Sequence, residues 1–171
     1  MSTGSWSQEQ TFRLNSDPRL PPLTDADGAD QLKMAMDVGN EIKTLYDTLA
    51  KLRDAKQQTA KIAEKGGPAA AAAKTFTDQI VAVEGDITQL QGEAGQDALN
   101  FPGRLDNQWV ALYSNIVQEE RKLNKSVRDR YADLRAPTDD VMRRAQTVLT
   151  ADLAAFNAAA SKAGAGTVVV K

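Results

Sequence analysis

Apolar residues recur three and four positions apart along four separate stretches of the chain, and this spacing constrains its fold more than any other feature. Such spacing gathers the apolar side chains on one face of a helix. We predict helices over residues 24–62, 69–90, 100–125 and 126–162. The second stretch is the most regular, with Phe76, Ile80, Val83, Ile87 and Leu90. The stripe assigned to the first stretch comprises Leu32, Met36, Ile42, Leu45, Tyr46, Leu49 and Leu52.

Helices that are apolar on one face need one another, because each apolar face must be removed from water. Four of them joined by turns predict an all-α fold, an antiparallel up-down four-helix bundle with a short extended N-terminal segment. We divide the chain into an extended strand and linker segment over residues 1–23, the bundle over residues 24–163, and a flexible tail over residues 164–171.

Local signals indicate where the predicted helices begin and end. Asp27 follows Thr24 at the spacing of a capping box, and Gly66-Gly67-Pro68 ends the first helix. Pro137 is expected to kink or interrupt the last helix, with Thr138 available to cap the part that follows. The predicted N-caps of the first, third and fourth helices are Thr24, Asn100 and Ser126.

The N-terminal segment has a different pattern. Phe12 and Leu14 alternate with polar residues, as in a half-buried strand, and we predict a strand over residues 8–14. Three prolines between positions 18 and 22 then favour an extended linker. Because one strand is not stable alone, this segment is expected to pack on a neighbour. The candidate partner contacts are Trp6, Phe12 and Leu14.

Composition excludes several kinds of chemistry. The chain has no His and no Cys, which excludes Ser-His-Asp and Cys-His catalysis and leaves only oxygen ligands for a metal. The formal net charge is −2, which argues against broad attraction to nucleic acid. Basic residues between Arg121 and Arg144 alternate with acidic ones, a pattern typical of a solvated face with salt bridges. No run reaches the roughly 18 apolar residues of a membrane span, and residues 1–10 lack the pattern of a signal peptide.

No residue is predicted to be catalytic, to bind a cofactor or to hold a metal. Asp139 and Asp140 are interpreted as acidic residues in the first turn of a helix, where the helix dipole favours them. Trp109 is interpreted as a core residue. An alternative hypothesis is a cavity between helices that binds a small molecule or supports hydrolysis. The aromatic residues that could line it are Tyr46, Trp109, Tyr113 and Tyr131.

Several motifs carry a family resemblance. Residues 6–14, Trp-Ser-Gln-Glu-Gln-Thr-Phe-Arg-Leu, precede Asp17-Pro18-Arg19-Leu20. Further along, Leu99-Asn100-Phe101-Pro102 leads to Trp109 and Leu112-Tyr113, and residues 152–157 read Asp-Leu-Ala-Ala-Phe-Asn. In this order the motifs resemble the C-terminal helical module of bacterial sortilin-like BNR-repeat propeller proteins, which are often labelled glycosyl hydrolases.

The resemblance implies a non-enzymatic accessory or scaffolding module, the C-terminal part of a larger propeller-containing protein. The repeats behind the hydrolase label are absent from this sequence, so the resemblance transfers no catalytic residue. It implies the parent propeller or a β-sandwich as partner, or another protein, and a place in the cell envelope or outside the cell. Self-association through remaining apolar surface is a third hypothesis.

Overall fold

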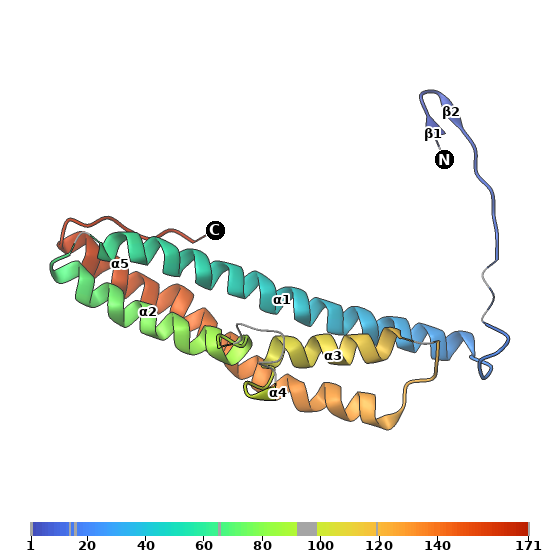
Figure 1. The fold of residues 1–171 in the computed structure, drawn as a ribbon. Coiled ribbons are helices and arrows are strands. Elements are labelled where there is room, and N and C mark those ends of the chain that lie inside the picture. Colours follow the sequence, from blue (N-terminus) through green and yellow to red (C-terminus); the bar gives the residue numbers. More distant parts are fainter. Residues whose placement is uncertain are drawn as a thin grey trace.

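The longest helix, α1 (Asp25–Ala63, 39 residues), sets the length of the molecule. At about 1.5 Å per residue it is about 58 Å long, and α2, α3 and α4 all pack along it (Figure 1). The computed structural model describes residues 2–13, 15, 17–64, 66–91, 99–118 and 120–170. The other helices are α2 (Pro68–Ile87), α3 (Leu105–Val117), α4 (Lys125–Thr147), a π-helical turn η2 (Val148–Asp152) and α5 (Leu153–Lys162).

The helices form three columns of nearly equal length (Figure 1). The first column is α1, and the second is α4, η2 and α5, which join into one rod of about 57 Å. The third column consists of α2 and α3, placed end to end along α1. In one half of the molecule α2 packs against both α1 and α5, and in the other half α3 packs against both α1 and α4.

The predicted all-α helical bundle is confirmed, but the order of helix directions differs from up-down-up-down. The Gln31 side chain near the start of α1 donates a hydrogen bond of 2.6 Å to the carbonyl of Ile116 at the end of α3. Arg128 at the start of α4 pairs with Asp30 at the start of α1. Thus α3 is antiparallel to α1, as α2 is, and α4 is parallel to it. The connection from α2 to α3 spans residues 88–104, and a connection of that length does not force the reversal that a short turn imposes.

The core follows one continuous stripe of α1. Val38, Leu45, Leu49 and Leu52 are at most 1 % exposed and meet residues of the other two columns. Leu32 and Met36, which the periodicity placed on this stripe, are each 61 % exposed, so that assignment is wrong. The buried stripe begins at Val38 instead and continues through Leu45, Leu49 and Leu52. In the half that contains α5, Phe76 stacks on Phe156 with ring centroids 5.1 Å apart.

The predicted start of the first helix is confirmed, and the predicted starts of the third and fourth helices are wrong. Thr24 caps α1 in a capping box, since its hydroxyl oxygen accepts from the Asp27 amide at 3.1 Å while Asp27 Oδ2 accepts from Thr24. Helix α3 begins at Leu105, beyond Asn100. Helix α4 begins one residue before Ser126, because the side chain of Asn124 accepts the Val127 amide at 3.0 Å and takes the N-cap position.

Pro137 does not interrupt the helix that contains it. Helix α4 continues from Lys125 to Thr147, and the irregular turn lies beyond it, at η2. The Thr138 hydroxyl donates to the Leu134 carbonyl at 2.7 Å rather than capping a new helix. Packing of α4 on α1, α2 and α3 outweighs the hydrogen bond that the proline removes.

The described N-terminal segment forms a hairpin in place of the predicted strand. Strands β1 (Ser2–Thr3) and β2 (Trp6–Ser7) pair antiparallel around a turn in which Gly4 has a φ of 58°. Residues 8–13 have no strand structure, so the strand predicted over 8–14 is wrong for them. No neighbouring strand within the described residues is available to pair with them.

The C-terminal segment packs on the bundle, which corrects the prediction of a flexible tail. After α5, Gly164 adopts a φ of 69° and the Ala165 amide donates to the Ala160 carbonyl at 2.9 Å, a Schellman motif that turns the chain back. The Asn157 side chain then makes two hydrogen bonds with the backbone of Val168, which is 2 % exposed. Gln58 of α1 binds the backbone of Val169 in the same way.

A pair of leucine variants tests the revised stripe. We expect Leu52→Ala to lower the free energy of unfolding by about 2–5 kcal/mol, because it leaves a cavity in the core. The control Leu32→Ala is expected to change it by less than about 0.5 kcal/mol, since this side chain is exposed. Urea unfolding followed by circular dichroism measures both. Equal losses would contradict the register described here.

Candidate functional site

The three candidate partner contacts lie outside the helical columns or outside the described residues. Trp6 is 49 % exposed on β2 and Phe12 is 80 % exposed in the extended segment that follows. Leu14 lies outside the residues that the structure describes. Figure 1 shows the hairpin standing away from the helices at the end of an extended chain. Trp6 and Phe12 therefore present apolar surface to solvent, away from the bundle core.

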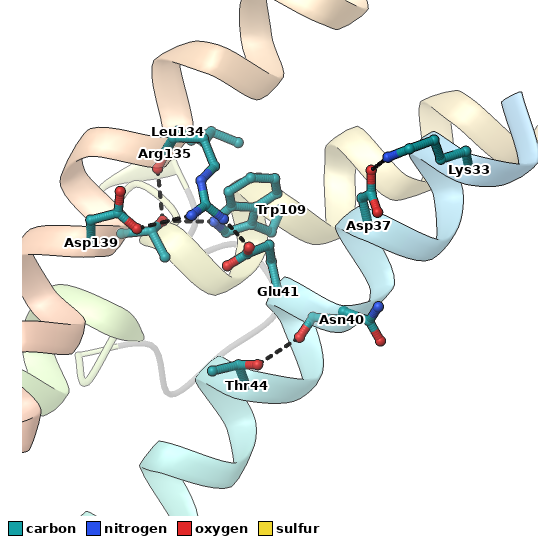
Figure 2. A network of polar contacts seen from close by, with 10 residues as sticks. Lys33, Asp37, Asn40, Glu41, Thr44, Trp109, Leu134, Arg135 and Asp139 are labelled. Atoms are coloured by element: carbon teal, nitrogen blue, oxygen red, sulfur yellow. Dashed lines mark hydrogen bonds and ion pairs between the residues drawn. The ribbon is translucent and has the colours of Figure 1, made fainter. Parts of the chain in front are cut away.

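A small polar layer joins α1, α3 and α4 at the level of Trp109 (Figure 2). Trp109 is fully buried, which confirms its interpretation as a core residue. Its indole N–H donates to the hydroxyl of Thr138 at 2.9 Å, so the nitrogen has a partner inside the core. Beside it, Arg135 of α4 pairs with Glu41 of α1 and with Asp139 one turn further along α4. This layer links three helices, and its polar groups form hydrogen bonds and ion pairs with one another.

The aromatic residues of the cavity hypothesis do not surround one space. Trp109 and Tyr131 contact each other edge to face, with ring centroids 5.5 Å apart. Tyr113 lies one turn beyond Trp109 on α3 and faces α1, where its ring would be 3.8 Å from a Cβ added at Gly39. Tyr46 is 46 % exposed on α1. The structure thus brings two of the four together, within the packed core.

The acidic pair Asp139 and Asp140 lies in the middle of α4, so its interpretation as first-turn charge is wrong. Asp139 pairs with Arg135, and Asp140 pairs with both Arg143 and Arg144. The prediction of a solvated face with salt bridges is confirmed for most of this basic segment. Its ion pairs to other helices include Lys122–Asp27, Arg128–Asp30, Arg135–Glu41 and Arg144–Asp86.

Glu84 is a buried carboxylate that the sequence pattern did not identify. Its side chain is 2 % exposed in α2 and accepts hydrogen bonds from Arg53, at 2.7 Å, and from Lys56, both on α1. Burial raises the pKa of Glu84, but the hydrogen bonds from Arg53 and Lys56 outweigh it and hold this pKa below its ordinary value of 4.5. The carboxylate is therefore charged at neutral pH and fastens α2 to α1.

Metal ligands are not gathered in the part of the chain that the structure describes. No three acidic side chains there converge closely enough to hold an ion. Among the same residues, no helix combines the length and apolar content that a membrane crossing requires.

A groove of about 530 Å³ lies between α3 and the start of α4, and we call it the α3–α4 groove. Leu112 and Val127, both nearly buried, form its apolar floor. Two arginines and several amide side chains line its walls. They are Arg121, Arg130, Asn107, Gln108, Asn115 and Asn124.

A second groove of about 390 Å³ lies between α1 and the π-helical turn. Its charged lining residues are Asp47 and Lys51, one of each sign, and the rest of the lining is neutral. It therefore has no net charge to select an ionic ligand, which sets it apart from the α3–α4 groove.

The α3–α4 groove could not be found from the sequence. Arg121 and Arg130 belong to the basic segment predicted to be ion-paired, and their distinct surroundings come from residues on another helix and in the connecting loop. The chain was also compared with protein-family models, curated proteins and solved structures, and it matches none of them.

The buried carboxylate predicts a pH dependence. Because its pKa is lower in the folded chain than in the unfolded chain, its contribution to stability is fully present above about pH 4.5 and is lost as pH falls through the folded-state pKa. We expect Glu84→Gln to lower the free energy of unfolding by roughly 1–3 kcal/mol at pH 7 and by progressively less below pH 4.5.

Asp78→Asn is the matched control, because Asp78 is an exposed carboxylate of the same helix paired with Lys74. Its effect is expected to stay below about 1 kcal/mol. Urea unfolding at a series of pH values measures both variants. A Glu84→Gln effect that is independent of pH would contradict the assignment.

Proposed function

We propose that this chain is a non-enzymatic accessory or scaffolding module, a helical spacer that holds a partner domain through its N-terminal segment. In line with the resemblance described above, we propose the partner to be the propeller or the β-sandwich of a larger protein. The observation that carries the proposal is the separation of a filled, three-column bundle from an exposed segment bearing Trp6 and Phe12.

The interior of the bundle supports a structural role. Among the described residues, every buried side-chain nitrogen or oxygen has a hydrogen-bond partner. The buried polar residues Thr138 and Glu84 each join two helices, through Trp109 and through Arg53 and Lys56. Groups committed to one another in this way stabilise the packing and are not free to act on a substrate.

Exposed apolar residues along the seam between α1 and α3 support contact with another protein. Leu32 and Met36 share a face of α1 with Gly39, which faces Tyr113 of α3. Val117 lies one turn beyond Tyr113 on the same helix. Leu32, Met36, Tyr113 and Val117 are between 37 and 61 % exposed, and a group of exposed apolar side chains on neighbouring helices suits contact with another protein.

The spacer role predicts a fixed length. The chain has no cysteine, so Lys33→Cys and Lys61→Cys allow spin labels to be placed near the two ends of α1 without background. We expect a narrow distance distribution near about 42 Å, because both positions lie on one continuous helix. Pulsed electron spin resonance measures it, and the two singly labelled variants control for distances between molecules. A broad or much shorter distribution would exclude a rigid spacer.

Partner binding through the N-terminal segment predicts a change in tryptophan fluorescence. Trp6 is half exposed and Trp109, the only other tryptophan, is fully buried. We expect the emission maximum to shift to shorter wavelength when a separately produced sortilin-like propeller with its β-sandwich is added, because the partner removes Trp6 from water.

In the control Trp6→Phe, which leaves the bundle unchanged, the shift is expected to disappear. In Phe12→Ala it is expected to need a higher partner concentration. Absence of any shift in the unmodified chain, or a shift that persists in Trp6→Phe, counts against partner binding through this segment.

A further inference from the structure

We propose that the α3–α4 groove is a binding site for a small organic anion, a carboxylate or phosphate carried on an apolar group. This inference is independent of the spacer role, because the groove lies on the bundle and shares no residue with the N-terminal segment. It rests on three observations, namely the charge of the groove, the unused hydrogen-bond donors in its walls and the apolar floor.

The described residues that line the groove carry positive charge only. Arg121 and Arg130 both line it, and no acidic residue does among those the structure describes. Elsewhere on the bundle, Arg128, Arg135 and Arg144 each pair with a carboxylate of another helix. Arg121 and Arg130 form no such pair with any described acid. Two guanidinium groups that no described carboxylate neutralises attract anions.

Neutral oxygen atoms hold the two guanidinium groups in place. Nη2 of Arg121 donates to the backbone and side-chain oxygens of Asn115, at 2.6 and 2.7 Å. Nη2 of Arg130 donates to Oε1 of Gln108 at 2.7 Å. These partners orient the groups without neutralising them. Each guanidinium has five N–H donors, and the remaining donors can bind a carboxylate or phosphate in the planar, two-pronged manner that suits these anions.

The apolar floor of the groove favours an anion that carries an apolar group. Leu112 is 5 % and Val127 is 3 % exposed, and Ala111 lies beside them on the lining. An apolar group placed over this floor gains about 25 cal/mol for each Å² of apolar surface removed from water. The volume of about 530 Å³ lies within the range of small-molecule sites. A ligand with one anionic end and one apolar end therefore fits better than a bare ion.

Four small probes test the site. Phenyl phosphate and benzoate combine an anionic end with an apolar ring, inorganic phosphate has no ring, and benzamide has the ring without the charge. We expect phenyl phosphate and benzoate to bind the full chain with one site and a Kd of about 1 mM or tighter. Inorganic phosphate and benzamide are each expected to bind at least about tenfold more weakly. NMR titration measures the affinity and locates the site through the shifted amides.

Arginine variants connect the binding to this groove. We expect Arg121→Gln and Arg130→Gln each to weaken phenyl phosphate binding by about tenfold and the double variant to abolish it. Arg143→Gln is the matched control, since Arg143 is an exposed arginine of α4 that pairs with Asp140. It is expected to leave the affinity unchanged. Circular dichroism spectra confirm that each variant keeps its helices.

The outcomes separate the proposal from its competitors. Binding of phenyl phosphate that survives the double variant, or that is equally weakened by Arg143→Gln, overturns the site. If benzamide binds as tightly as benzoate, the role of charge is overturned. If inorganic phosphate binds as tightly as phenyl phosphate, the role of the apolar floor is overturned. No saturable binding of either ringed anion overturns the proposal as a whole.

Discussion

The fold depends on covering one apolar stripe along a helix of 39 residues. From Val38 to Ile62 the stripe keeps the same face of α1, over most of a length of about 58 Å. Helices α2 and α3 are each too short to cover the whole stripe, so they lie end to end and each covers a part of it. The third column matches α1 in length because α4, η2 and α5 continue as one rod. Each half of the molecule therefore contains three helices, with α2 between α1 and α5 in one half and α3 against α1 and α4 in the other.

The buried polar groups of the bundle form hydrogen bonds and ion pairs between different helices. Trp109 would leave its indole N–H without a partner in an apolar core, and Thr138 supplies one from the opposite helix. Glu84 is buried, and the two cations that satisfy it come from α1. At the α3–α4 groove the pattern changes, because Arg121 and Arg130 are held by amide and carbonyl oxygens and keep their charge. That difference separates a part of the molecule that stabilises the fold from one suited to a ligand.

Some errors of the sequence interpretation have a shared physical cause. Leu32 and Met36 have the right spacing for the stripe, but at their level α3 and α4 pack on other faces of α1, and their side chains stay exposed. Ser126 is a good N-cap residue, yet Asn124 is another and lies where the chain turns. Pro137 weakens a helix locally, but packing on both sides keeps α4 continuous. For Leu32, Met36 and Pro137 the packing of the helices outweighed a local preference, whereas for Ser126 a nearby residue, Asn124, took the N-cap position instead.

The amino-acid sequence by itself determined that this chain is helical, where α1 starts and ends, and that its buried residues are mainly apolar, because spacing and capping act within a few residues. Only the tertiary structure decided that α3 runs in the same direction as α2, that Asn157 and Gln58 dock the C-terminal segment, and that Arg121 and Arg130 share one groove. These features bring together residues that are far apart in the chain. The spacing of apolar residues along a helix shows which face is apolar, but it does not show which neighbouring helix will cover that face.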